Sequence, residues 1–454
     1  MCSNKSEGEK STARKRNKPR RPAKSAAKSS RASELSAQAA PNPPVPGHGA
    51  LTRVLKYGEK IYGLCSGLRK VRDKRVRPGI PGGQVAVAFL ITILARLGSL
   101  NALEQRKAPP AWVAWMGGPL PLADVMGDAA CSLDLGPLRS LLLQQHRRYK
   151  RNKGFARGND GFRYLILDGH EGVSSYRRTW KECLERVVHF DKGDRTQSYF
   201  RYVGAYLTNG KHPILLDAER QLPGEGEIAC ALRLLERLLE KCPRAFDVVC
   251  GDNAYMDPAL WKLVRGHKKH LIAVLKNENR DLLVDARALF AGMAPVVYDS
   301  ENVKRLCWDL EGFTTWPQCG EPVRVVRSVE TSSIKRQRSK KSETMETEWF
   351  WVTSLPSLLA PTRAIVRAGH GRWDIENHGF NELGNQWHGD HGYRYNAHAL
   401  LACTLLLFIA YNLFHSFIER NIKPEARAGR TAKYWADLIA ADFIGVFHLS
   451  ARPG

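Results

Sequence analysis

Phe162-Arg-Tyr-Leu-Ile-Leu-Asp-Gly-His170 and Phe246-Asp-Val-Val-Cys-Gly-Asp-Asn253 are two short apolar runs that each lead into an acidic residue. Runs of β-prone residues bounded by Gly and Asp are typical of buried strands. We therefore expect one strand to end at Asp168 and another just before Asp252. Because α/β proteins expose ligand-binding groups at the carboxyl ends of their strands, these two carboxylates are the first candidates for a functional site.

The pattern around these runs predicts an α/β domain. The expected elements are strands at 162–167, 198–207 and 213–216, a helix at 227–241, a strand at 245–250, a helix at 257–266 and a strand at 270–275. This order favours a mixed sheet flanked by helices, whose first strands form an antiparallel meander. The turn Thr208-Asn209-Gly210 fits a hairpin between the second and third strands.

Composition divides the rest of the chain. We predict a disordered basic arm at 1–48, a helical region at 49–157, an α/β domain at 158–276 and 345–420, a β-rich insertion at 277–344 and a C-terminal tail at 421–454. A mobile loop is expected near 331–347, and one helix over about 361–384. Ala397–Phe417 approaches the length of a membrane span, but His398, Asn412 and His415 interrupt it, so a buried core helix is the expected structure and no membrane partner is predicted.

The charge of the chain indicates a polyanionic partner. Lys and Arg total 70 against 45 Asp and Glu, which is a formal net charge of +25 among 454 residues. Nucleic acid is the commonest partner of such a chain, although any single basic run can also be a solvated face. The basic runs lie at 1–31, at 69–77, at 335–341 and in a segment that contains Arg147, Arg148, Lys150 and Arg151.

The ten Cys residues include no Cys-x-x-Cys pair, which argues against a zinc finger and a dense disulfide framework and suits a reducing cytoplasm. The histidines near Trp387 have no regular zinc-ligand spacing. Asp217 and Glu219 are further acidic residues, but no partner spacing supports a catalytic role for them.

Two carboxylates on neighbouring strands would repel each other unless a cation lay between them, and oxygen ligands favour Mg²⁺ or Mn²⁺. The alternative for each Asp is an ordinary turn or capping residue. Glu376 is the third candidate, with Arg372 four residues earlier on the same helical face, where a surface ion pair is the alternative. Asp374 lies about 200° around the helix from Glu376, so both cannot face one site.

The trio Asp168, Asp252 and Glu376, with its flanking residues, resembles the DDE transposases of bacterial insertion sequences, which have a ribonuclease-H-like fold. The resemblance extends from about 85 to 420. The matching stretches are Leu-Asp-Gly-His-Glu (167–171), Gly-Glu-Gly-Glu (224–227), Arg-Ala-Phe-Asp-Val-Val (244–249), Val-Leu-Lys-Asn-Glu (274–278) and Arg-Trp-Asp-Ile-Glu-Asn (372–377). Arg372 and Glu376 resemble part of a Tyr-Arg-Glu-Lys signature, but Gly369 and Leu383 stand where its Tyr and Lys are expected.

The resemblance implies two Mg²⁺ (or Mn²⁺) ions held by the acidic trio, with double-stranded DNA as substrate. It implies cleavage of the ends of a mobile element and transfer of the 3′ ends to target DNA, by a homodimer in the bacterial cytoplasm and nucleoid. The expected DNA contacts are Arg372, Lys276, the basic residues at 147–151 and Trp387, which would stack on an unpaired base. A metal-dependent nuclease and a non-catalytic DNA-binding protein from a decayed element are the alternatives.

Overall fold

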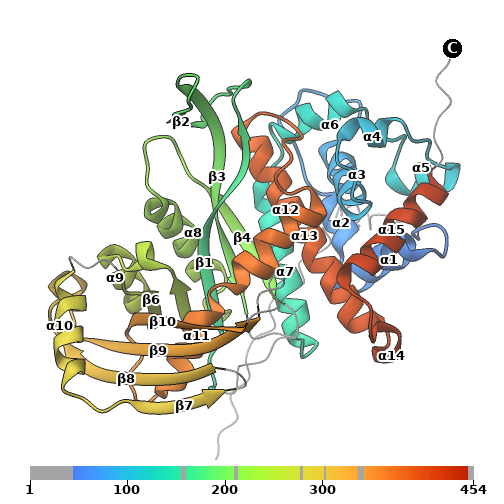
Figure 1. The fold of residues 1–454 in the computed structure, drawn as a ribbon. Helices are drawn as coiled ribbons and strands as arrows, with labels where there is room; N and C mark the ends of the chain where they lie inside the picture. Colours follow the sequence, from blue (N-terminus) through green and yellow to red (C-terminus); the bar gives the residue numbers. More distant parts are fainter. Residues whose placement is uncertain are drawn as a thin grey trace, which may run out of the picture. The chain divides into compact units, whose positions relative to one another are not determined.

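A mixed sheet of ten strands forms the centre of the fold (Figure 1). The computed structural model describes residues 44–154, 160–208, 213–276, 280–300, 303–335 and 342–447. The strands are β1 (Tyr164–Ser175), β2 (Leu184–Val188), β3 (Arg195–Leu207), β4 (Ile214–Arg220), β5 (Val248–Gly251), β6 (His270–Val274), β7 (Val296–Ser300), β8 (Val303–Phe313), β9 (Val323–Lys335) and β10 (Ser342–Thr353). Their order is β2-β3-β1-β5-β6-β10-β9-β8-β7, with β4 also on β3.

The first strand differs from its prediction. β1 continues past Asp168 to Ser175, because the 13-residue β3 pairs antiparallel with it along that whole length. The apolar run stops at Leu167, but hydrogen bonds to β3 keep the following residues in the strand. The predicted hairpin is confirmed, since β4 pairs antiparallel with β3; its tip at 209–212 lies outside the described residues. β2 was not predicted, because Leu-Glu-Arg-Val-Val is a short edge strand with mostly exposed side chains.

The predicted β-rich insertion belongs to the same sheet as β1 to β6. β10 pairs antiparallel with β6, with Trp351 opposite Val274. Helix α10 (Asp281–Ala291) precedes the four added strands and was not predicted. The predicted mobile loop near 331–347 is wrong over the described residues, because β9 and β10 pair up to Lys335 and Ser342. Residues 336–341 lie outside the described part of the chain.

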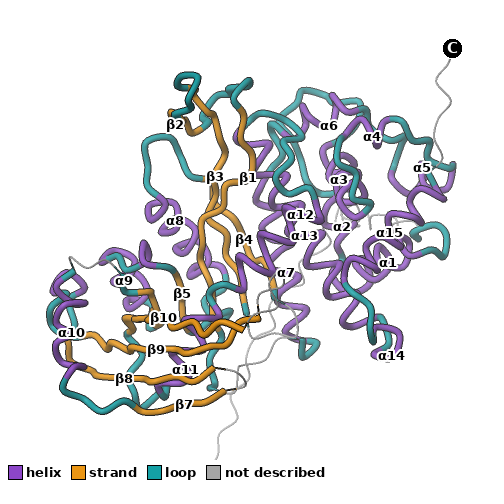
Figure 2. The backbone as a smooth tube through the Cα atoms, in the orientation of Figure 1, coloured by secondary structure: helices purple, strands orange, loops and turns teal. Residues whose placement is uncertain are grey.

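Helices cover both faces of the sheet at β3 and β4 (Figure 2). The helical region before the sheet is confirmed where it is described, as α1 (Ala50–Tyr62), α2 (Leu64–Leu68), α3 (Gly82–Leu94), α4 (Leu100–Glu104), α5 (Pro110–Met116), α6 (Ala123–Ala130) and α7 (Leu135–Arg151). The predicted helices after β4 and β5 are α8 (Glu227–Lys241) and α9 (Pro258–Gly266). α8 packs on one face of β3 and β4, and α7 and α13 (Ala397–Asn421) pack on the other.

The C-terminal part of the fold contains one confirmed prediction and two corrections. α13 is long and apolar enough to cross a bilayer, yet 94% of its most apolar window is buried inside the protein, as expected for a core helix. The helix predicted over 361–384 is three segments: α11 (Thr362–Gly371), the π-helical η3 (Ile375–Phe380) and α12 (Asn381–Trp387). The predicted tail contains α14 (Pro424–Arg427) and α15 (Ala432–Val446), and α15 packs on α1.

The domain boundaries inside residues 42–454 stay predictions. Residues 42–454 form a single unit. The predicted basic arm falls almost entirely outside the described residues, and so does most of the basic run at 335–341.

Candidate active site

The strand register brings Asp168 and Asp252 level with each other. β1 and β5 are parallel neighbours, with Ile166 beside Cys250, so two further residues along each chain set Asp168 beside Asp252. Tyr164, Ile166, Val248 and Cys250 belong to the same core cluster, which lies on one face of the sheet. Because side chains alternate between faces, Asp168 belongs to that face, and Asp252 follows the last residue of β5 directly and acts on the Asp168 carboxylate through its charge.

Both aspartates also make the local contacts expected of turn residues. The Asp252 Oδ1 accepts the backbone N–H of Ala254 at 2.8 Å and caps the 3₁₀ turn η1 (Asn253–Tyr255). The Asp168 Oδ1 accepts the N–H of Gly169 at 3.0 Å. Both aspartates therefore act as turn or capping residues, which was the alternative in the sequence. The hydrogen bond orients each carboxylate and leaves its second oxygen for other partners.

Burial and neighbouring carboxylates raise the pKa of Asp168 to about 6. Burial is the largest cause, followed by the charge of Glu227; the charge of Asp252 acts in the same direction, and the Arg372 guanidinium acts against them. These interactions group three acidic residues and one cation around the middle of β1. Asp168 and Asp252 carry like charges, and Asp168 is partly buried. A cation bound between them would reduce their repulsion.

Glu227 is the acidic neighbour that sequence reasoning missed. It is the first residue of α8, where the Arg201 guanidinium and the Tyr255 hydroxyl, at 2.9 Å, donate to its carboxylate. Gly169 allows this approach, because a Cβ there would lie 2.5 Å from the Glu227 Oε2. The sequence contained one sign of Glu227, the Gly-Glu-Gly-Glu match at 224–227 before an amphipathic helix. Its contacts with Arg201 and Tyr255 depend on the fold and could not be predicted.

Arg372 lies next to this group, whereas Glu376 is exposed on η3. η3 packs on the sheet through Phe380, whose ring fills the space that a side chain at Gly204 would need. Asp374 accepts a hydrogen bond at 3.3 Å from the hydroxyl of Thr208, the residue that follows β3. π-Helical turns are rare in proteins, and those that occur are often found at functional sites.

The structure thus brings Asp168, Asp252 and Arg372 together and leaves Glu376 at the surface. Within the described ranges, no group of three or more His, Cys, Asp or Glu side chains is arranged to hold a metal ion.

The two departures from the Tyr-Arg-Glu-Lys pattern have packing explanations. A Cβ on Gly369 would lie 2.2 Å from the Trp351 Nε1, so the indole occupies the space that any side chain at 369 would need. Leu383 is 1% exposed and belongs to the core around α13. Both positions are filled by core contacts from this chain's own residues.

The predicted DNA contacts differ in their accessibility. Lys276 is exposed at the end of β6, where its backbone N–H donates to Asn253 Oδ1 at 3.1 Å and its ammonium lies 5.0 Å from the Trp349 ring centre. Lys276 therefore lies directly beside the turn that Asp252 caps. Arg147, Arg148, Lys150 and Arg151 form the last turns of α7, and three of them line a cavity of about 540 Å³.

Trp387 cannot stack on a base as it is placed, so that prediction is wrong. Its side chain is 1% exposed, its ring contacts Phe414 with centroids 4.9 Å apart, and its N–H donates to Glu382 at 3.2 Å. The Arg96 guanidinium covers the ring, 5.0 Å from its centroid. The apolar residues of α13 explain the error, because they need a large partner in the core.

The raised pKa of Asp168 leads to a stability prediction in metal-free buffer. The folded state binds the proton more tightly than the unfolded chain, so this carboxyl costs nothing below pH 4 and its cost grows as pH rises from about 4 to about 6. Asp168→Asn is expected to stabilise the fold by up to about 3 kcal/mol at pH 7.5 and by nearly nothing at pH 4. Urea unfolding at both pH values measures this, and an equal effect at both would contradict it.

Comparison with known families gives one match. A protein-family model described as a transposase DDE domain matches residues 187–413, which is half of the chain. The matched range includes Asp252, Arg372 and Glu376, and it begins after Asp168. No curated protein matches the chain.

Proposed function

The chain belongs to the transposase DDE domain family, and from this premise we propose that it binds the ends of a mobile DNA element, cleaves them and joins the 3′ ends to target DNA. Transposases of this family act on DNA with divalent metal ions. The observation that carries the proposal is the level placement of Asp168 and Asp252 on neighbouring parallel strands, with a raised Asp168 pKa.

Asp168, Asp252 and Glu376 would hold two Mg²⁺ or Mn²⁺ ions, because hard cations prefer carboxylate oxygens. Such ions, when bound, activate a water or a 3′-hydroxyl and stabilise the leaving oxygen of the phosphodiester. Glu376 is exposed on η3, four residues after Arg372, so its carboxylate is accessible to a metal ion from solvent. Asp374 is not proposed as a ligand, because its two carboxylate oxygens contact Thr208 and His378.

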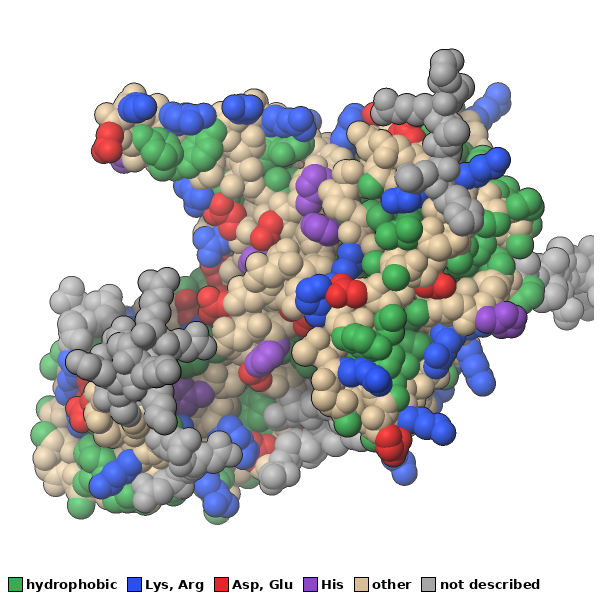
Figure 3. Space-filling model, turned by 45° about the vertical axis from the view of Figure 1, so that its right-hand side comes forward, with side chains coloured by type: hydrophobic (Ala, Val, Ile, Leu, Met, Phe, Trp, Pro, Cys, Tyr) green, Lys and Arg blue, Asp and Glu red, His purple; other side chains and the backbone are tan. Residues whose placement is uncertain are grey.

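The remaining residues of the site would bind the DNA. Arg372 would contact a phosphate on the face that carries Asp168, since its guanidinium already interacts with that carboxylate. Lys276 would contact the backbone beside the Asp252 turn. Lys and Arg side chains also form a row along the projection at the upper left of Figure 3, where Figure 1 places β2. A basic surface of this extent suits double-stranded DNA.

A transposase must hold two element ends for concerted joining, so we propose a homodimer on DNA, acting in the bacterial cytoplasm and nucleoid. The alternatives remain a metal-dependent nuclease and a non-catalytic DNA-binding protein.

One assay separates the three functions. Labelled duplexes that carry the DNA flanking this reading frame are incubated with the full chain, a plasmid target, and either Mg²⁺ or EDTA. A transposase joins the label to the plasmid only with Mg²⁺. A nuclease shortens the duplex without joining it, and a binding protein shifts its mobility without cutting. Joining that persists in EDTA, or the absence of cleavage in Mg²⁺, would contradict the proposal.

A further inference from the structure

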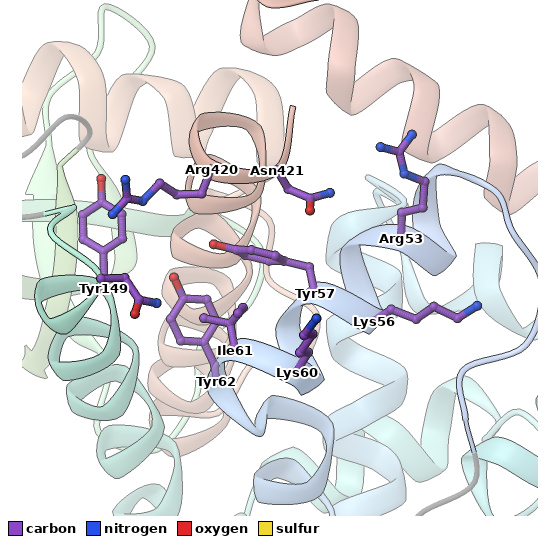
Figure 4. Close-up of a pocket in the computed structure, with 10 residues that line it drawn as sticks. Arg53, Lys56, Tyr57, Lys60, Ile61, Tyr62, Tyr149, Arg420 and Asn421 are labelled. Atoms are coloured by element: carbon purple, nitrogen blue, oxygen red, sulfur yellow. The ribbon is translucent and has the colours of Figure 1, made fainter. Parts of the chain in front are cut away.

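A cavity of about 400 Å³ opens between α1 and the C-terminal ends of α7 and α13 (Figure 4). Tyr57 and Lys60 reach it from α1, Tyr149 from α7 and Arg420 from α13. All four belong to helices that pack on one another, so the walls of the cavity are fixed by the core of this helical region. The volume falls in the range of small-ligand sites.

The lining is strongly cationic. Its residues include four cations, Arg53, Lys56, Lys60 and Arg420, and none of the lining residues is acidic. The neighbouring Glu419 is 3.8 Å from the Arg420 guanidinium and offsets part of that charge. A concave site that concentrates several positive charges attracts a multivalent anion.

The same cavity has an aromatic wall of three tyrosines. The Tyr57 hydroxyl donates to the Ser416 carbonyl at 3.2 Å, and the Tyr57 ring meets Tyr62 at 5.8 Å and Phe417 at 5.7 Å, edge to face in both cases. These contacts hold the ring in one orientation, across the cavity between Arg420 and Lys60 in Figure 4. An oriented aromatic ring beside cations is the arrangement on which nucleic-acid bases stack.

We propose that this cavity binds a nucleotide, with its phosphate at Lys60 and Arg420 and its base against Tyr57. The cations supply the anion contact and the ring supplies the stacking, so the ligand needs both a phosphate and an aromatic base. A nucleotide within a DNA strand and a free nucleotide share this chemistry. The proposal concerns binding alone and does not depend on cleavage at Asp168 and Asp252.

The test measures binding by the full chain in EDTA, so that no catalysis contributes. The probes are a fluorescein-labelled 12-nucleotide single strand, ATP as its competitor, and inorganic phosphate as a second competitor. We expect Lys60→Gln combined with Arg420→Gln to weaken strand binding at least tenfold and to lower the salt slope by about 1.4. Tyr57→Leu is expected to weaken it about tenfold.

Lys262→Gln combined with Lys304→Gln is the matched control, because it removes the same charge from exposed positions on α9 and β8. Unchanged binding by both cavity variants, or an equal loss in the control, would overturn the proposal. Competition by ATP that the cavity variants abolish identifies a free nucleotide, and binding of the strand alone identifies DNA. Inorganic phosphate that competes as well as ATP would refute the stacking contact, and the thermal unfolding midpoint of each variant reports its folding.

Discussion

Asp168→Asn is expected to reduce metal-dependent DNA cleavage by about 10³-fold or more while DNA affinity stays within about twofold. An amide keeps the shape of the side chain but removes the charge and one of the two oxygen ligands. The Gly169 N–H and the β1–β3 pairing remain, so the backbone of the site is unaffected. Cleavage is measured by single-turnover kinetics and affinity by fluorescence anisotropy.

Two further variants sharpen this result. Asp252→Asn should lose as much activity as Asp168→Asn, because the two carboxylates act at one site. Asp374→Asn is the matched control, since that carboxylate contacts Thr208 and His378 instead, and it should keep activity within about tenfold. A measured gain in stability of Asp168→Asn at pH 7.5 would exclude unfolding as the cause of the loss. Full cleavage activity of Asp168→Asn would contradict the proposed catalytic role of this site.

Asp217→Ala is expected to destabilise the fold by about 3–5 kcal/mol. Asp217 lies on β4 with 3% exposure, and it accepts hydrogen bonds from Arg139 at 3.1 Å and from Arg237 at 2.8 Å. Removing it leaves two guanidinium groups close together, with the Glu219 carboxylate and the Ala218 carbonyl as their remaining shared partners. The cluster connects α7 and α8 to β4, so its loss weakens the attachment of the helical region to the sheet.

The free energy of unfolding in urea tests this prediction, with the slope m compared between variants. Lys433→Ala is the control, because its pair with Asp437 is exposed and such pairs contribute less than about 1 kcal/mol. A loss below 1 kcal/mol for Asp217→Ala would show that the cluster does not support the fold. The ionic role of Asp217 depends on contacts with Arg139 and Arg237 that only the structure shows.

The spacing of apolar residues was sufficient to predict a helix or strand wherever that element buries one regular face. The spacing of apolar residues in α8 and α13 predicted both helices, because a stripe or a full apolar surface has few other stable placements. It was insufficient where hydrogen bonds from a distant strand extend an element. β1 beyond Asp168, and the polar ends of β9 and β10, are strands because of their partners.

The amino-acid sequence by itself determined the mixed α/β class, the placement of Asp252 directly after a buried strand and the basic character of the chain, since each follows from local pattern and composition. Only the tertiary structure decided that Asp168 and Asp252 are level, that Glu227 and Arg372 set the charge around them, and that Trp387 is a core residue. These depend on register and packing between segments far apart in the chain, where small shifts change which side chains meet.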